Sequence, residues 1–177
     1  MTRTTMPGLG TALALAVGLC TLASPASAEI IAKDYFINAS GNCNGALPTY
    51  EGALRKRPLA IRNEGTTNAF VSCSIPRSQA DDGYTLVGAY FTNSTGSDKT
   101  INCTLVDGAV GIGEPALYPR SLILAAGTTN FIAWNSEEFE LAEFASWINL
   151  SCNLPAGTEI GLIGGYYGFE NGVPPAP

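Results

Sequence analysis

The chain has 177 residues, a net charge of −6 and no histidine. This acidic balance argues against binding to nucleic acid or to anionic membranes, because both carry negative charge. The absence of histidine excludes Ser-His-Asp and Cys-His catalysis and the H-E-x-x-H zinc site, since each needs an imidazole. The sequence predicts no catalytic, cofactor-binding or metal-binding residues, and no cofactor.

Residues 1–28 have the three parts of a secretory signal. Arg3 precedes an apolar run over residues 9–23, and alanines at 26 and 28 form an A-x-A cleavage site. The apolar run is shorter than the ~20 residues that a membrane-spanning helix needs. The pattern therefore favours a cleaved signal over its alternative, an N-terminal membrane anchor.

Cleavage is expected between Ala28 and Glu29. A lipoprotein site at Cys20 is the other alternative, but Leu19 is not the small residue that precedes a lipidated cysteine. We therefore expect a protein that is secreted or periplasmic, without stable insertion in a membrane. The remaining 177 − 28 = 149 residues suit one domain.

We assign residues 29–170 to that single domain and residues 171–177 to a disordered tail. Loss of the signal removes one basic residue, so the mature chain has a net charge of 8 − 15 = −7.

Period-2 alternation of apolar and polar residues is the strongest pattern in the mature chain. Ile148, Leu150, Cys152 and Leu154 alternate with amide and hydroxyl residues, which predicts a strand with one buried face. A helix is expected only over 136–145, capped by Ser136. The expected strands, in chain order, are 59–63, 70–75, 85–92, 100–105, 121–125, 128–135, 148–154 and 159–169.

Turn residues separate these strands at intervals of roughly ten residues. Short strands at such spacing are typical of an all-β fold. We predict an antiparallel β-sandwich, jelly-roll or Ig-like, with about seven to nine strands.

Four cysteines remain after cleavage: Cys43, Cys73, Cys103 and Cys152. An even number in an exported chain predicts two disulfides. If 70–75, 85–92 and 100–105 form a meander, the Cys73 and Cys103 strands flank a third strand and lie too far apart to be bonded. Cys43–Cys73 with Cys103–Cys152, and Cys43–Cys103 with Cys73–Cys152, remain. The first is favoured because Cys43 lies in a turn-like segment that enters just before the Cys73 strand.

Three motifs resemble an uncharacterised group of exported proteobacterial β-sandwich proteins. They are N…V-x-C from Asn63 to Cys73, the C-x-L at Cys103, and C-x-L-P-x-G from Cys152 to Gly157. The resemblance spans residues 59–170. It departs from the group at 74–76, where proline is expected directly after the cysteine. The motifs are structural, so the resemblance implies a secreted β-sandwich and no activity.

Clustered acids are the remaining source of catalytic chemistry. A glycosidase needs two carboxyl groups at a defined separation. The candidates are Glu137, Glu138, Glu140 and Glu143, with Asp81 and Asp82 in a predicted turn. Clustered acids more often form a solvated face, and the basic residues 55–57 are interpreted in the same way, as a solvated loop.

Aromatic side chains are the candidate ligand platform, because sugars stack on flat rings. Tyr166 and Tyr167 are adjacent on a strand, so one ring must face outward. Trp134 is a further candidate for the platform, although its place at the end of an apolar strand favours core packing. Tyr90 is considered as well, and Trp147 is expected in the core.

The sequence thus favours a non-enzymatic binding or structural module of unknown partner, with a glycan or a protein as the ligand classes considered. The alternative is a carboxylate-dependent, glycosidase-like hydrolase. A deep pocket with two acids of raised pKa would favour the hydrolase, and an aromatic patch without an acidic cleft would favour the binding module.

Overall fold

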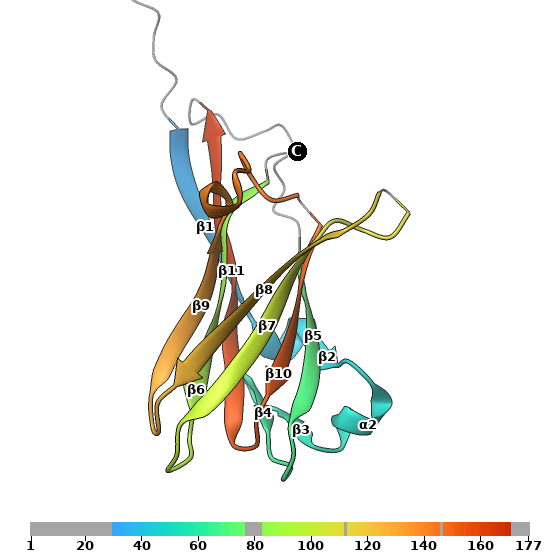
Figure 1. Ribbon diagram of the computed structural model, residues 1–177, viewed down its shortest axis with the longest axis vertical. Coiled ribbons are helices and arrows are strands. Elements are labelled where there is room, and N and C mark those ends of the chain that lie inside the picture. The colour runs from blue at the N-terminus through green and yellow to red at the C-terminus, as the bar shows by residue number, and fades with distance from the viewer. Residues whose placement is uncertain (1–29, 77–82, 112, 146, 171–177) are drawn as a thin grey trace, which may run out of the picture.

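The computed structural model describes residues 30–76, 83–111, 113–145 and 147–170. These residues form two antiparallel β-sheets packed as a sandwich (Figure 1), so the predicted fold class is confirmed. The described residues contain eleven strands, more than the seven to nine expected. The elements are β1 (Ile30–Asn38), α1 (Ala39–Asn42), β2 (Cys43–Gly45), α2 (Pro48–Glu51), β3 (Leu54–Lys56), β4 (Ile61–Asn63), β5 (Ala69–Ile75), β6 (Tyr84–Asn93), β7 (Lys99–Asp107), β8 (Ala116–Leu124), β9 (Thr129–Asn135), η1 (Ser136–Phe139), β10 (Ile148–Leu154) and β11 (Thr158–Glu170).

Sheet A, the larger sheet, has the strand order β3-β4-β11-β6-β9. Its long strand β11 pairs with β4 near its start and with β1 along the rest of its length. The first residue of β1, Ile30, is opposite the last residue of β11, Glu170. Sheet B has the order β2-β5-β10-β7-β8.

The core lies between the two sheets and follows the alternation in the sequence. Along β10 the buried residues are Ile148, Leu150, Cys152 and Leu154, and the residues between them are half-buried. Strand β5 alternates in the same way between buried and exposed residues. The largest fully buried side chains are Trp134, Tyr84, Phe91 and Phe144.

Both disulfides lie within sheet B and join residues that are direct partners on neighbouring strands. Cys43–Cys73 connects β2 to β5, and Cys103–Cys152 connects β7 to β10, with Cα atoms 4.0 and 4.1 Å apart. The favoured pairing is therefore confirmed. The meander that supported it is wrong, because β6 lies in sheet A and β10 is the strand between β5 and β7. Alternation shows which side of a strand is buried, but not which sheet the strand joins.

Two buried asparagines tie the sheets together at one end of the sandwich. Asn63 ends β4 in sheet A, and its amide donates to the Leu154 carbonyl at the end of β10 in sheet B, at 2.7 Å. Asn93 ends β6, and its amide donates to the Leu124 carbonyl at the end of β8, at 3.0 Å. Both asparagines are 0% exposed. Asn63 lies ten residues before Cys73, and Asn93 lies ten residues before Cys103, so the same sheet-to-sheet turn is used twice at the same spacing.

The predicted helix over 136–145 is largely wrong. Only η1, a four-residue 3₁₀ turn, forms there, and it ends at Glu140, which has a φ of 58°. Its N-cap is Asn135 rather than Ser136, because the Asn135 side chain accepts a hydrogen bond from the Glu137 N–H. The segment then extends and pairs Phe144 with Tyr84 in an isolated bridge. Within the described ranges, no helix is long and apolar enough to cross a membrane.

Candidate functional site

The outer face of sheet A, away from the core, carries a group of aromatic side chains. Alternation along β6 and β9 turns Tyr90 and Phe131 outward, and they are 42% and 52% exposed. They are direct cross-strand partners, with ring centroids 5.6 Å apart. Phe36 on β1 and Tyr166 on β11 form a second pair, edge to face, at 5.7 Å. Two aromatic pairs from four strands therefore lie on one face.

A groove of about 210 Å³ separates these two pairs. Its floor is formed by Gly88 on β6 and Ala133 on β9, which are also cross-strand partners. One side is formed by Tyr90 and Phe131, and the other by Leu86 and Tyr166, with Phe36 at the β1 end.

The sequence of β6 explains this depression. Leu86, Gly88 and Tyr90 face outward in succession, and the glycine leaves a gap between two large side chains. Four residues of a strand span about 13 Å, so the walls stand far enough apart to admit one ring-shaped group. The small side chain of Ala133 continues the gap onto β9. The groove is therefore built into two short stretches of alternating large and small residues.

Polar groups lie around this apolar groove. Tyr90 and Tyr166 contribute phenol hydroxyls, each of which donates and accepts hydrogen bonds. Asp34 is exposed on β1 at the position that pairs with Tyr166. Asn135 lies on the edge strand β9, opposite Leu86 of β6. Its side-chain oxygen caps η1 by accepting a hydrogen bond from the Glu137 N–H. An apolar groove with a few polar groups at its rim is typical of small-molecule binding sites.

Of the predicted platform residues, only Tyr166 belongs to this groove. Tyr167, the next residue, points to the other face and packs against the core, with its ring 6.2 Å from that of Tyr84. Trp134 lies in the core, as favoured, and not on the platform, because it is 0% exposed and its indole N–H donates to the Tyr118 carbonyl at 2.8 Å. Tyr90, which the sequence analysis also considered, lines the groove.

Sequence reasoning missed Phe36 and Phe131. Phe131, Ala133 and Asn135 alternate with buried residues along β9, so their outward direction follows from a pattern visible in the sequence. Phe36 lies in β1, a strand that the sequence analysis did not predict. Its approach to Tyr166 depends on the pairing of β1 with β11.

The expected core position of Trp147 is also wrong. Its side chain is 52% exposed and borders a separate pocket with Ile75 and Pro76. Trp147 precedes the first buried residue of β10, Ile148, and so lies before the alternating strand begins.

The clustered glutamates lie on the surface around η1. Glu137, Glu138, Glu140 and Glu143 are all exposed, and Glu138 forms an ion pair with Arg120. The other acidic candidates, Asp81 and Asp82, lie outside the described residues. In the part of the chain that is described, no group of three metal-ligating side chains gathers to hold an ion.

Asp107, at the end of β7, is a carboxyl group with a shifted pKa. Burial raises the pKa of this carboxyl above the ordinary value for aspartate, and a hydrogen bond from the Ala145 N–H opposes this rise. Burial is the main cause that raises the pKa of Tyr118, and the negative charge of Asp107 raises it further. Asp107 does not line the groove on sheet A.

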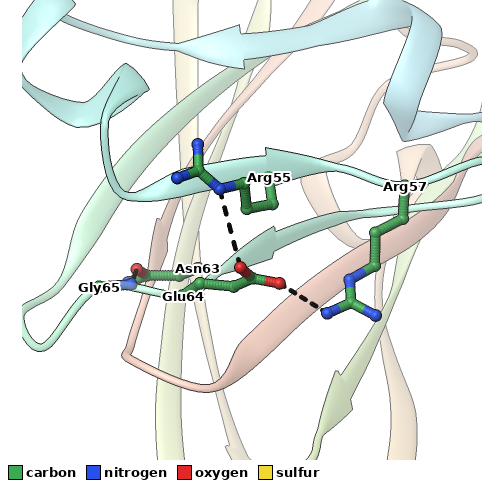
Figure 2. A network of polar contacts seen from close by, with 5 residues as sticks. All are labelled: Arg55, Arg57, Asn63, Glu64 and Gly65. Atoms are coloured by element: carbon green, nitrogen blue, oxygen red, sulfur yellow. Dashed lines mark hydrogen bonds and ion pairs between the residues drawn. The ribbon is translucent and has the colours of Figure 1, made fainter.

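The basic residues 55–57 lie on β3 and the turn after it, as expected for a solvated segment. Glu64 lies between two of their side chains (Figure 2), with 2.6 Å to the Arg57 guanidinium and 3.8 Å to Nε of Arg55. Lys56 donates to the Asn44 side chain at 2.7 Å. Glu64 thus neutralises one of the three positive charges of this segment, and Lys56 bonds to an uncharged amide.

No protein-family model matches the sequence, and no curated protein matches it. The solved structures with a similar arrangement include two carbohydrate-binding modules. One is the family 11 carbohydrate-binding module from Clostridium thermocellum with a β-1,3-1,4-mixed-linked tetrasaccharide, 12% identical, with a TM-score of 0.39 and coverage of 80% of this chain and 83% of that one. The other is TmCBM61 with β-1,4-galactotriose, 12% identical, with a TM-score of 0.31 and coverage of 77% and 88%. At these TM-scores the likeness supports no conclusion about function.

Proposed function

We propose that the protein is a non-enzymatic exported module that binds glycans in the groove on sheet A. The observation that carries this proposal is the pair of aromatic walls on either side of a floor made of Gly88 and Ala133. A sugar ring presents C–H groups on its faces and hydroxyls around its edge. Aromatic walls suit the faces, and the tyrosine hydroxyls suit the edge.

The size of the groove favours a glycan over a folded protein partner. Stable protein–protein interfaces bury about 1,200–2,000 Å² in total. A groove of about 210 Å³ bordered by a few side chains is suited to a narrow ligand instead.

The hydrolase alternative has little support in the described residues. The pocket beside Asn63 contains a carboxylate, Glu64, and that group is paired with arginines. The groove on sheet A has no carboxylate among its lining residues. Two acids at a defined separation are what a glycosidase needs.

The test is affinity electrophoresis of the mature protein in gels that contain soluble neutral polysaccharides: a β-glucan, a xylan, a galactan and a mannan. We expect at least one of them to retard the protein. Tyr90→Ala or Phe131→Ala removes one ring, which is worth about 1 kcal/mol beyond the lost contact area, so binding weakens roughly five- to tenfold. Ala133→Leu keeps every aromatic ring but fills the floor, and we expect it to abolish binding.

Phe70→Ala is the matched control. Phe70 is 41% exposed on β5, in the other sheet, so its loss removes an exposed ring without touching the groove. Failure of all four polysaccharides to bind, or equal weakening by Phe70→Ala and Tyr90→Ala, would contradict the proposal.

A further inference from the structure

The groove is closed at its β1 end. Phe36 faces outward from β1, at the position paired with Gly164 of β11, and its ring meets Tyr166 edge-on. Among the described strands, β1 lies at the edge of sheet A on this side, since β11 is its one partner. A ligand lying along the floor toward β1 therefore meets the Phe36 ring.

The opposite end of the groove is open. Strand β9 is the edge strand of sheet A there, and the side chain that it places on the floor is the methyl group of Ala133. Phe131 and Asn135 project on either side of that methyl group, two residues away in each direction. A glycan chain that leaves the groove over Ala133 thus passes between Phe131 and Asn135 and beyond the edge of the sheet.

The groove is also short. From β1 to β9 the sheet spans three strand spacings, about 14 Å, and Phe36 occupies the first part of that length. The volume of about 210 Å³ lies below the ~300–1,000 Å³ that is usual for pockets enclosing a whole drug-sized ligand. The space suits the last unit or two of a chain, with the remainder outside.

We propose that the groove recognises the end of a glycan chain rather than a stretch of its interior. This inference rests on the proposed function. The terminal sugar ring lies over Gly88 with Phe36 in front of it, and the chain continues across Ala133 into solvent. Phe36 acts as a stop that prevents a continuous chain from lying through the groove.

The test is calorimetric titration of the mature protein with the polysaccharide that binds best in the electrophoresis. The polymer is used whole and after partial acid hydrolysis, at equal mass. End recognition predicts that the number of binding sites per gram rises in direct proportion to the number of chain ends, so halving the mean chain length doubles it. Interior binding predicts that this number does not rise.

Phe36→Ala removes the stop. For this variant we expect the whole polymer to offer several times more sites per gram than it offers the unchanged protein, whatever happens to the affinity per site. Phe70→Ala, the control, keeps the unchanged number. If the whole and hydrolysed polymers offer the unchanged protein equal numbers of sites per gram, end recognition is overturned while the proposed function stands. If no polysaccharide binds at all, the proposed function itself fails.

Discussion

Replacing the buried Asn93 with alanine tests whether the sheet-to-sheet turn stabilises the fold. The Asn93 amide donates to the carbonyls of Ser97, Leu124 and Ala125 at 2.9, 3.0 and 3.2 Å. Its side-chain oxygen accepts from the backbone N–H and the hydroxyl of Thr95, at 3.0 and 2.7 Å. One side chain therefore orders the β6–β7 turn and holds it to the end of β8.

The expected loss of stability comes mainly from the buried Leu124 carbonyl, which water cannot reach once the asparagine is removed. Leu124 is 0% exposed, so water cannot replace the hydrogen bond that its carbonyl loses, and this loss costs about 1–3 kcal/mol. Ser97 is exposed and Thr95 is half-buried, so water replaces much of their bonding and their loss adds only about 1 kcal/mol. We expect Asn93→Ala to lower the free energy of unfolding by about 3 kcal/mol, or roughly 6–12 °C in Tm for a domain of this size.

The assay is urea denaturation with the disulfides intact, followed by the fluorescence of the buried Trp134. Asn102→Ala is the matched control, because Asn102 is exposed on β7 and accepts a single side-chain bond from Ser121. We expect that control to lose less than about 1 kcal/mol. A similarly small loss for Asn93→Ala, with an unchanged dependence on urea concentration, would refute the reasoning.

Three further predictions concern the disulfides, one carboxyl group and the signal. In the chain-entropy treatment, replacing both cysteines of the Cys103–Cys152 bond with serine costs about 4 kcal/mol, slightly more than for Cys43–Cys73, because the sequence separation is 49 rather than 30 residues; urea denaturation giving the reverse order would contradict this. Asp107 has a folded pKa above its unfolded value, so the stability it contributes is present below about pH 3.8 and is lost as pH rises through the folded pKa. Asp107→Asn keeps an oxygen for the Ala145 N–H and should remove this loss of stability with rising pH. If the urea midpoints of the variant and the unchanged protein run parallel from about pH 3 to about pH 7, Asp107 is not the cause of the loss. Mass spectrometry of the exported protein should show Glu29 at the N-terminus, and a lipidated Cys20 there would rule out the predicted cleavage.

The eight strands predicted from sequence all form, and one-sided burial imposes a strict alternation on β5 and β10. Strand β10 is the clearest case, with four buried residues at every second position. The three strands that were not predicted lie in the first part of the domain. β2 and β3 have three residues each, too few to show a period, and β1 lacks a clean apolar–polar alternation.

The groove was only partly predictable, because it depends on which strands are neighbours. Adjacent tyrosines at 166 and 167 guarantee that one ring faces outward, and the structure selects Tyr166. That Tyr166 meets Phe36, and Tyr90 meets Phe131, depends on strand pairing between segments far apart in the sequence. Trp134 shows the converse, since its indole N–H finds a partner in the Tyr118 carbonyl of β8 and the whole ring is buried.

The pairing of Ile30 with Glu170 brings the start of β1 beside the end of β11, as the blue and red strands show in Figure 1. Opposed residues in antiparallel strands have Cα atoms only about 5 Å apart. A few residues would therefore be enough to join these ends, and new termini opened in an exposed hairpin would give a circular permutant with the same sheets. For the same reason, these strands can be inserted together into a surface loop of a host protein without forcing the two ends of that loop apart. The open end of the groove, at β9, would then lie at the edge of sheet A opposite the points of attachment.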